Sequence, residues 1–195
     1  MGCDAKGFSL IELLVVLVVL AILVSLAAPS FARVIASTRV STQVNDFMAD
    51  ARFARGEAMR RGLKVILCPS DSPEASTPTC TANTGSNVNW NTGWLVFVSN
   101  DANTSYNAAD TLLRVHPALG GIASVQSGTA SSTPSSISYN AAGLGTNPEN
   151  LIFSPSGAYE SDASVQRQLC INFVGRIRVN VDANGAPQIQ TTCSS

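Results

Sequence analysis

One acidic side chain stands inside a long apolar segment near the start of the chain. The segment from Phe8 to Ala28 has 21 residues, and Glu12 is the only charged residue among them. As a helix, this segment would span about 31 Å, close to the roughly 30 Å hydrocarbon core of a bilayer. A carboxylate inside an apolar membrane helix costs about 2.5–3.5 kcal/mol, so its presence indicates a specific partner. We expect that partner to be a positive charge.

Four of the five cysteines lie beyond the apolar segment. An even number of cysteines past a membrane segment is typical of an oxidising compartment, where disulfides form. Four cysteines allow three pairings, and we favour Cys68 with Cys80 and Cys170 with Cys193 because each pair is close in sequence. The first disulfide would close a 13-residue loop, worth up to about 3 kcal/mol if it acts on chain entropy. A zinc site is not expected, because the sequence has no Cys-x-x-Cys pair.

Arg176 and Arg178 are a pair of residues that could bind a ligand. Residues two apart in a strand point to the same face, so the two guanidinium groups would lie together and suit phosphate oxygens. Two alternatives stay open: the arginines protect a sheet edge from aggregation, or they pair with a carboxylate such as Asp182. The net charge is −1 and only 13% of residues are charged. Binding of nucleic acid by this pair would therefore be weak and salt-sensitive.

The motifs of common enzyme classes are absent from the sequence. There is no Gly-x-Ser-x-Gly elbow, no Walker loop and no Gly-x-Gly-x-x-Gly fingerprint, and the only histidine, His116, has no acidic residue nearby in sequence. The stretch from Asp101 to Ser105 resembles the opening of a calcium loop. However, Tyr106 stands where the glycine should be and Leu112 where the closing glutamate should be. We expect no catalysis, no metal ion and no cofactor.

A single helix of about 50 residues is predicted to carry the apolar segment. Pro29 should kink it between Val24 and Pro29 without ending it, and Gly62 is a plausible stop signal. Beyond the proline, apolar residues recur every three or four positions, at Val40, Val44, Phe47, Ala51, Ala54 and Ala58. The opposite, polar face is predicted to carry Gln43, Asp46, Asp50, Arg55, Glu57 and Arg61. Glu57 and Arg61 are spaced as a favourable ion pair.

After Gly62 the pattern changes to short strand-like runs separated by Gly, Pro, Asn and Ser. The predicted strands are 64–68, 94–99, 111–115, 122–125, 136–139, 151–153, 168–174, 176–181 and 187–190. Asn184-Gly185 is a hairpin signal between the last two. The fold class is therefore α+β, with one long helix packed on one face of an antiparallel sheet.

The start of the chain, Gly7-Phe8-Ser9-Leu10-Ile11-Glu12, resembles the processing site of type IV pilins and type II secretion pseudopilins. The resemblance implies that a prepilin peptidase cuts after Gly7, that Phe8 is N-methylated, and that residues 1–7, including Cys3, are a discarded leader. It also implies that Glu12 neutralises the N-terminal amine of a neighbouring subunit during assembly. Two plainer interpretations are a secretory signal cut after Ala27 and a generic membrane anchor.

The head is similar to the GspH/FimT family of minor pilins and pseudopilins. The matching pieces occur in order along the chain: residues 51–58, Val65-Ile66-Leu67-Cys68, Gly93-Trp94-Leu95-Val96-Phe97, Phe153-Ser154-Pro155-Ser156-Gly157, Leu169-Cys170-Ile171 and Gly175-Arg176-Ile177-Arg178. The resemblance implies a type IV pilin-like fold with a leader (1–7), a membrane or filament-core helix (8–28), its amphipathic continuation (29–62) and a head (63–195).

The family also implies a function. A minor pilin of this kind sits in the inner membrane with its head in the periplasm and primes or caps a pilus or pseudopilus, together with other pilins and an inner-membrane assembly platform. Two alternatives remain. Some FimT-like members carry Gly-Arg-x-Arg and act in DNA uptake, which would give Arg176 and Arg178 a role, and a membrane-anchored adhesin would use the loop 69–93. A type IV pilus role and a type II secretion role share the same N-terminal chemistry.

Overall fold

The computed structural model describes residues 8–81, 89–101, 103–127, 136–145, 149–181 and 188–189. Predictions about Gly7, Cys193 and the turn at 182–185 lie outside these residues, as does part of the strand predicted at 187–190. The chain divides into two compact units, residues 1–35 and residues 36–195. Each unit is described by itself.

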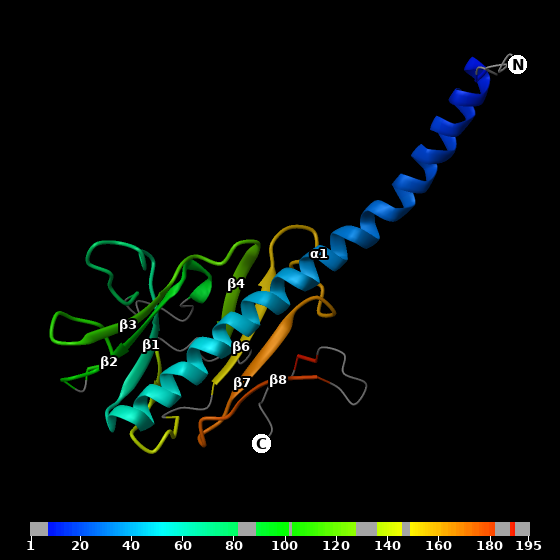
Figure 1. The fold of residues 1–195 in the computed structure, drawn as a ribbon. Helices are drawn as coiled ribbons and strands as arrows, with labels where there is room; N and C mark the ends of the chain where they lie inside the picture. The colour runs from blue at the N-terminus through cyan, green and yellow to red at the C-terminus, as the bar shows by residue number, and fades with distance from the viewer. Residues whose placement is uncertain are drawn as a thin grey trace, which may run out of the picture. The chain divides into compact units, whose positions relative to one another are not determined.

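A single helix, α1 (Leu10–Arg61), contributes to both units; Figure 1 shows it in blue to cyan. Its 52 residues confirm the predicted helix. At its start, the Ser9 hydroxyl accepts a hydrogen bond from the amide of Glu12 (3.3 Å), the interaction by which serine stabilises a helix N-terminus. α1 continues through Pro29, as expected, and the kink there stays a prediction.

The end of α1 is set by Gly62. This glycine has a φ of +68°, and its amide donates to the carbonyl of Ala58 (2.9 Å). Glycine adopts this left-handed conformation without steric cost, and the hydrogen bond satisfies a carbonyl that the helix end would leave free. The predicted stop signal is confirmed.

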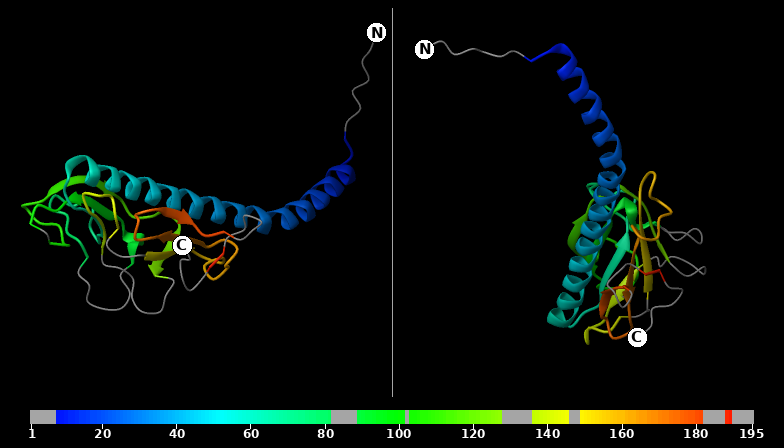
Figure 2. Two further views of the ribbon diagram at one scale, coloured as in Figure 1. Left: turned by 90° about the horizontal axis from the view of Figure 1, so that it is seen from below. Right: turned by 90° about the vertical axis from the view of Figure 1, so that its right-hand side faces the viewer.

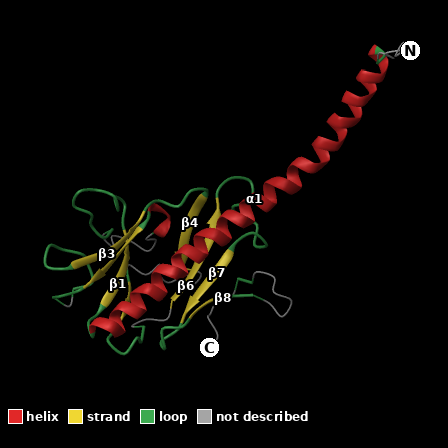
Figure 3. Cartoon of the chain, viewed as in Figure 1, coloured by secondary structure: helices red, strands yellow, loops and turns green. Residues whose placement is uncertain are grey.

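The described strands form two four-stranded antiparallel sheets, drawn in yellow in Figure 3. The first has the order β3-β2-β1-β5, from Val65–Pro69 (β1), Trp94–Val98 (β2), Thr111–His116 (β3) and Ile137–Tyr139 (β5). The second has the order β4-β6-β7-β8, from Ile122–Ser127 (β4), Glu149–Pro155 (β6), Arg167–Ile171 (β7) and Ile177–Val179 (β8). A short 3-10 helix, η1 (Trp90–Thr92), precedes β2.

The α+β class and the antiparallel pairing are confirmed, and every one of these strands overlaps a predicted one. The division into two sheets was not predicted. Between β3 and β6 the chain changes sheet at each connection, since β4 belongs to the second sheet and β5 to the first. Strand patterns report local alternation, and they carry little information about which distant strand becomes the partner.

The second half of α1 packs against the inner faces of both sheets (Figure 2). The predicted apolar stripe is buried, with Val40, Val44, Phe47, Ala51, Ala54 and Ala58 each no more than 2% exposed. Phe47 lies at the centre, in edge-on contact with Trp90, with Trp94 of the first sheet and with Phe153 of the second. The aromatic side chains therefore join one helix to two sheets.

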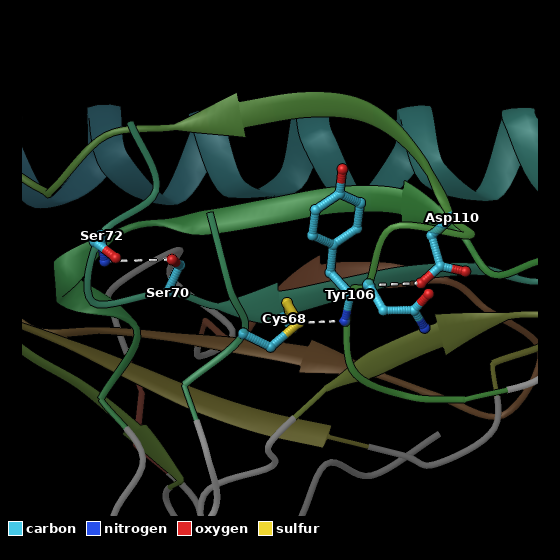
Figure 4. Close-up of a disulfide and its surroundings, with 7 residues drawn as sticks. Cys68, Ser70, Ser72, Tyr106 and Asp110 are labelled. Atoms are coloured by element: carbon cyan, nitrogen blue, oxygen red, sulfur yellow. Dashed lines mark hydrogen bonds between the residues drawn. A yellow bond between two sulfur atoms is a disulfide. The ribbon is translucent and has the colours of Figure 1, made fainter. Parts of the chain in front are cut away.

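The outer face of the first sheet is covered by loops. Ile66, Cys68, Leu95 and Phe97 point to this face and are fully buried, and Cys80 and Tyr106 pack against them. Figure 4 shows this region, where segments that follow β1 and β2 meet over the sheet. Strands β1 and β2 of the first sheet are thus buried on both faces, by α1 and by these loops, whereas the edge strand β3 is partly exposed.

Candidate functional site

The predicted assembly residues lie at the exposed start of α1. Phe8 is 85% exposed, and Glu12 is exposed in the first turn of the helix. The positive end of the helix dipole and the Ser9 cap both favour a carboxylate at this position. Gly7, after which cleavage is predicted, lies outside the described residues. The carboxylate of Glu12 is therefore accessible to a partner.

The apolar part of α1 offers a continuous surface with nothing from its own unit to cover it. In this segment Leu10, Leu17, Leu23 and Phe31 are all more than half exposed. Its most apolar 18-residue window has a mean hydropathy of 3.1, and it is long and apolar enough to cross a membrane. A helix that is apolar on every side needs lipid or other helices around it.

Arg176 and Arg178 flank the start of β8, on the second sheet. Both side chains are exposed, while Ile177 between them is 8% exposed, so the two arginines lie on the opposite side of the strand from Ile177. Within the described part of the chain, no ion pair is formed by either guanidinium. Asp182, the alternative partner, lies outside the described residues. Both guanidinium groups are therefore accessible from solvent, and their joint role in binding remains a prediction.

The polar side chains beside Arg178 hold β8 in register. Asn180 donates to the Gln168 side chain (2.8 Å), and Gln168 donates to Asn150 (2.6 Å). All three are less than 10% exposed. Because buried amides that lose their partners are costly, this ladder fixes β8 against β7 and β6.

The glycine before the arginine pair is required by packing. Gly175 has a φ of +72°, and a side-chain Cβ there would lie 2.3 Å from the carbonyl oxygen of Gly143. The same oxygen accepts a hydrogen bond from Nε of Arg55 (2.9 Å). The turn after β5, the turn before β8 and α1 therefore meet at one point. The sequence pattern did not reveal this junction, since its parts are distant in the chain.

Asp50 was predicted on the polar face of the helix, and this prediction is wrong. The residue is 7% exposed. Its carboxylate accepts hydrogen bonds from Nε1 of Trp94 (2.9 Å) and from the guanidinium of Arg114 (2.8 Å). The Arg114 guanidinium also lies 3.8 Å from the centre of the Phe53 ring. Partners on β2 and β3 compensate for burying the charge, and no helical periodicity could identify them.

The predicted disulfide between Cys68 and Cys80 is present, with Cα atoms 5.5 Å apart. It closes the loop that follows β1. Cys170, on β7, is also disulfide-bonded. Its predicted partner, Cys193, lies outside the described residues, so that pairing remains a prediction.

His116 and the loop at Asp101 have structural roles in the head. The His116 ring stacks on Trp94, with centroids 3.9 Å apart and planes 10° apart. Asp101 accepts hydrogen bonds from the amide of Asn103 (3.0 Å) and from the side chain of Asn107 (2.7 Å), and these bonds lower the pKa of its carboxyl. Among the described residues, no group of three His, Cys, Asp or Glu side chains is placed to hold a metal ion.

Comparisons with known proteins agree with this architecture. Residues 43–175 match the family model described as type II transport protein GspH, and residues 3–28 match the prokaryotic N-terminal methylation motif. None of the curated proteins compared with the chain matches it.

Two crystal structures of the type IV minor pilin FimU from Pseudomonas aeruginosa strain PAO1 resemble the fold. The P21 form has 17% sequence identity and a TM-score of 0.53, and the match covers 78% of this chain and 95% of that chain. The P65 form has 16% identity and a TM-score of 0.51, and the match covers 76% and 98%. At such low sequence identity, these matches show a similar fold and nothing about function. The family model spans more than half of the chain, and the chain therefore belongs to the GspH family of minor pilins and pseudopilins.

Proposed function

We propose that this protein is a non-catalytic subunit that primes or caps the assembly of a type IV pilus or a type II secretion pseudopilus. The observation that carries the proposal is the first half of α1, whose apolar side chains are exposed on every side around a single carboxylate. Such a surface is stable in a bilayer and also in a bundle of similar helices. A subunit that moves from one environment to the other would need both properties.

The N-terminal residues have defined roles in this proposal. Cleavage after Gly7 removes the leader 1–7 and creates a new amino group on Phe8, which is then methylated. The head, residues 63–195, occupies the periplasm, and the helix stays in the inner membrane until assembly. During assembly Glu12 accepts the positive N-terminus of a neighbouring subunit, and this pair sets the axial register of the helices.

The proposal is tested first by the mass of the mature N-terminal peptide from membranes, with and without prepilin peptidase. We expect a peptide that starts at methylated Phe8 and disappears when the peptidase is absent. A peptide that retains the leader, or one that starts after Ala27, would contradict processing as a pilin. If the protein were a generic anchored adhesin, the peptide would retain the leader.

Assembly itself is tested by substituting Glu12. Glu12→Ala should leave the protein in the membrane and strongly reduce its crosslinking to other pilins, because the amine of the neighbour loses its counter-charge. Glu12→Asp is the matched control, since it keeps the charge and should retain part of the crosslinking. Equal crosslinking for both variants and the unmodified protein would overturn the role of Glu12.

DNA binding is a second candidate function, and it rests on the exposed pair Arg176 and Arg178. Guanidinium groups donate two parallel hydrogen bonds to phosphate oxygens, which gives sequence-independent binding. With two contacts, the slope of log K against log salt should change by roughly 2 when both arginines are removed.

This candidate is tested on the full chain in neutral detergent micelles by fluorescence anisotropy with labelled duplex DNA. Arg176→Ala with Arg178→Ala should remove the salt-dependent binding. Arg60→Ala with Arg61→Ala is the control, because these two arginines are paired with Glu57. Equal losses in the two double variants would attribute binding to general charge and reject the site.

A further inference from the structure

We propose that the loops over the first sheet form a binding site for an uncharged saccharide. Between residues 76–79 and residues 106–108 lies an open-sided cavity of about 340 Å³. Binding sites for small molecules start at about 300 Å³, so the cavity has room for a small ligand. This inference is independent of the proposed assembly function, which uses the first half of α1.

The residues that line the cavity determine the charge of the ligand. None of them carries an ionised side chain at neutral pH: they are Ser, Thr, Pro, Thr, Tyr, Asn and Ala. A phosphate, a carboxylate or an amine would lose water there without gaining a counter-charge, which is costly. The lining therefore favours a neutral ligand.

The hydroxyl groups in one wall of the cavity favour a polar ligand. Ser76, Thr77 and Thr79 are exposed, and among the described residues their side chains form no hydrogen bond. A hydroxyl can both donate and accept, so three unused hydroxyls match the mixed donors and acceptors of a sugar. The same hydroxyls would disfavour a lipid chain.

The apolar surfaces in the cavity complete the match. The half-buried Tyr106 lies in one wall, while Pro78 and Ala108 add aliphatic surface. A pyranose ring has hydroxyls at its edge and C–H groups on its faces, so it can contact Tyr106 and the hydroxyls at once. An aromatic side chain with a polar end suits ligands of this mixed character.

The wall at 106–108 is held in place before any ligand binds. The Asn107 amide donates to the Asp110 carboxylate (3.0 Å), and the Asn107 side chain donates to Asp101 (2.7 Å). Figure 4 shows Asp110 beside Tyr106 in this loop. Fixing a loop in advance lowers the entropy that binding must remove.

The disulfide connects this wall to the other one. The amide of Tyr106 donates to Sγ of Cys80 (3.1 Å), and Cys80 directly follows the hydroxyl-bearing segment and is bonded to Cys68 on β1. The Tyr106 ring is also in edge-on contact with Phe97 of β2, with centroids 5.4 Å apart. Both walls are therefore attached to the first sheet, and the cavity keeps its shape.

The test is saturation-transfer NMR on the full chain in micelles of a detergent that has no sugar head group. The probes are glucose, galactose, N-acetylglucosamine, N-acetylgalactosamine and their common disaccharides, followed by titration of the best one. We expect saturable binding of at least one probe. Tyr106→Ala should weaken it about tenfold, the effect of losing about 1.4 kcal/mol.

Two further variants separate binding from folding. Thr77→Val with Thr79→Val removes two exposed hydroxyls while keeping side-chain shape, and it should weaken binding about tenfold through two lost hydrogen bonds. Thr104→Val is the control, since Thr104 is exposed and does not line the cavity. The proposal is overturned if no probe binds saturably, or if the double threonine variant and Thr104→Val bind equally well. Crosslinking to other pilins should be unaffected throughout.

Discussion

The two halves of α1 are both α-helical, but their apolar side chains have opposite surroundings. In the half that belongs to residues 1–35, the large apolar side chains of the helix are 49% to 83% exposed. In the half that belongs to residues 36–195, the apolar stripe is at most 2% exposed. The comparison shows that the second half finds its packing partners within the chain, whereas the first half requires lipid or other subunits.

The largest expected difference in stability is between two variants, each of which removes one phenylalanine from one half of α1. Phe47→Ala removes the ring at the centre of the core, and it should cost about 3–5 kcal/mol, or roughly 6–20 °C in Tm. Phe31→Ala removes a ring that is 69% exposed, so the Tm of the head should not change. The measurement is thermal unfolding in detergent micelles followed by tryptophan fluorescence, since Trp90 and Trp94 are both buried in the head. Equal decreases in Tm for the two variants would contradict the proposed difference between the two halves of α1.

A smaller effect is expected at Asp50, the charged residue that the second half buries. Asp50→Ala leaves Trp94 Nε1 and the Arg114 guanidinium without their acceptor, and it should cost about 1–3 kcal/mol in the free energy of unfolding. Asp46→Ala, on the exposed side of the same helix, should stay within about 0.5 kcal/mol. Urea unfolding of both variants checks the difference. A neutral Asp50→Ala would mean that water replaces the carboxylate.

A weaker, pH-dependent effect is expected at the end of the second half. Hydrogen bonds from Arg60 and Arg61 lower the pKa of the Glu57 carboxyl from 4.5 to about 2. A lowered pKa in the folded state means that the contribution to stability is full above 4.5 and is lost as the pH falls through about 2. Glu57→Gln should therefore lower the Tm slightly at neutral pH, and the difference should vanish in strong acid.

The salt dependence sharpens this prediction. Solvent screens the ion pairs of Arg60 with Glu57 and Arg61 with Glu57, so high salt should reduce the difference between the two proteins at neutral pH. A difference that is independent of both pH and salt would attribute the effect to helix propensity.

The smallest effect is expected where the head leaves a polar group unsatisfied. The Tyr139 hydroxyl is buried without a hydrogen-bond partner among the described residues, and burial raises its pKa. Tyr139→Phe removes this hydroxyl and keeps the ring, so stability should be unchanged or higher by up to about 1 kcal/mol. Calorimetry of both proteins checks this, and a clear loss of stability would reveal a partner for the hydroxyl.

The parts of the fold that depend on local periodicity could be predicted from the sequence. The apolar stripe from Val40 to Ala58 follows the helical repeat, and Gly62 ends the helix for reasons of backbone conformation alone. Cys68 with Cys80 was predictable because the partners are close in sequence. Asp50 was not, since its burial depends on Trp94 and Arg114, which lie on strands far along the chain.

The candidate sites also include features that could be predicted from sequence spacing and features that could not. Spacing alone predicts that Arg176 and Arg178 lie on one face of a strand, and both side chains are exposed. It could not reveal that Gly175 contacts Gly143 near Arg55, or that the loops after β1 and β2 meet at a cavity. Both features arise from three-dimensional proximity between segments that are distant in the chain.

The covered outer face of the first sheet has a consequence for producing the protein. Ile66, Leu95 and Phe97 are shielded there by a segment that the disulfide of Cys68 and Cys80 holds in place. In a reducing cytoplasm this covering would be less firmly held, and a buried strand face that becomes exposed promotes aggregation. The yield of folded protein should therefore depend on the compartment that the head enters during expression, and an oxidising compartment should give the higher yield.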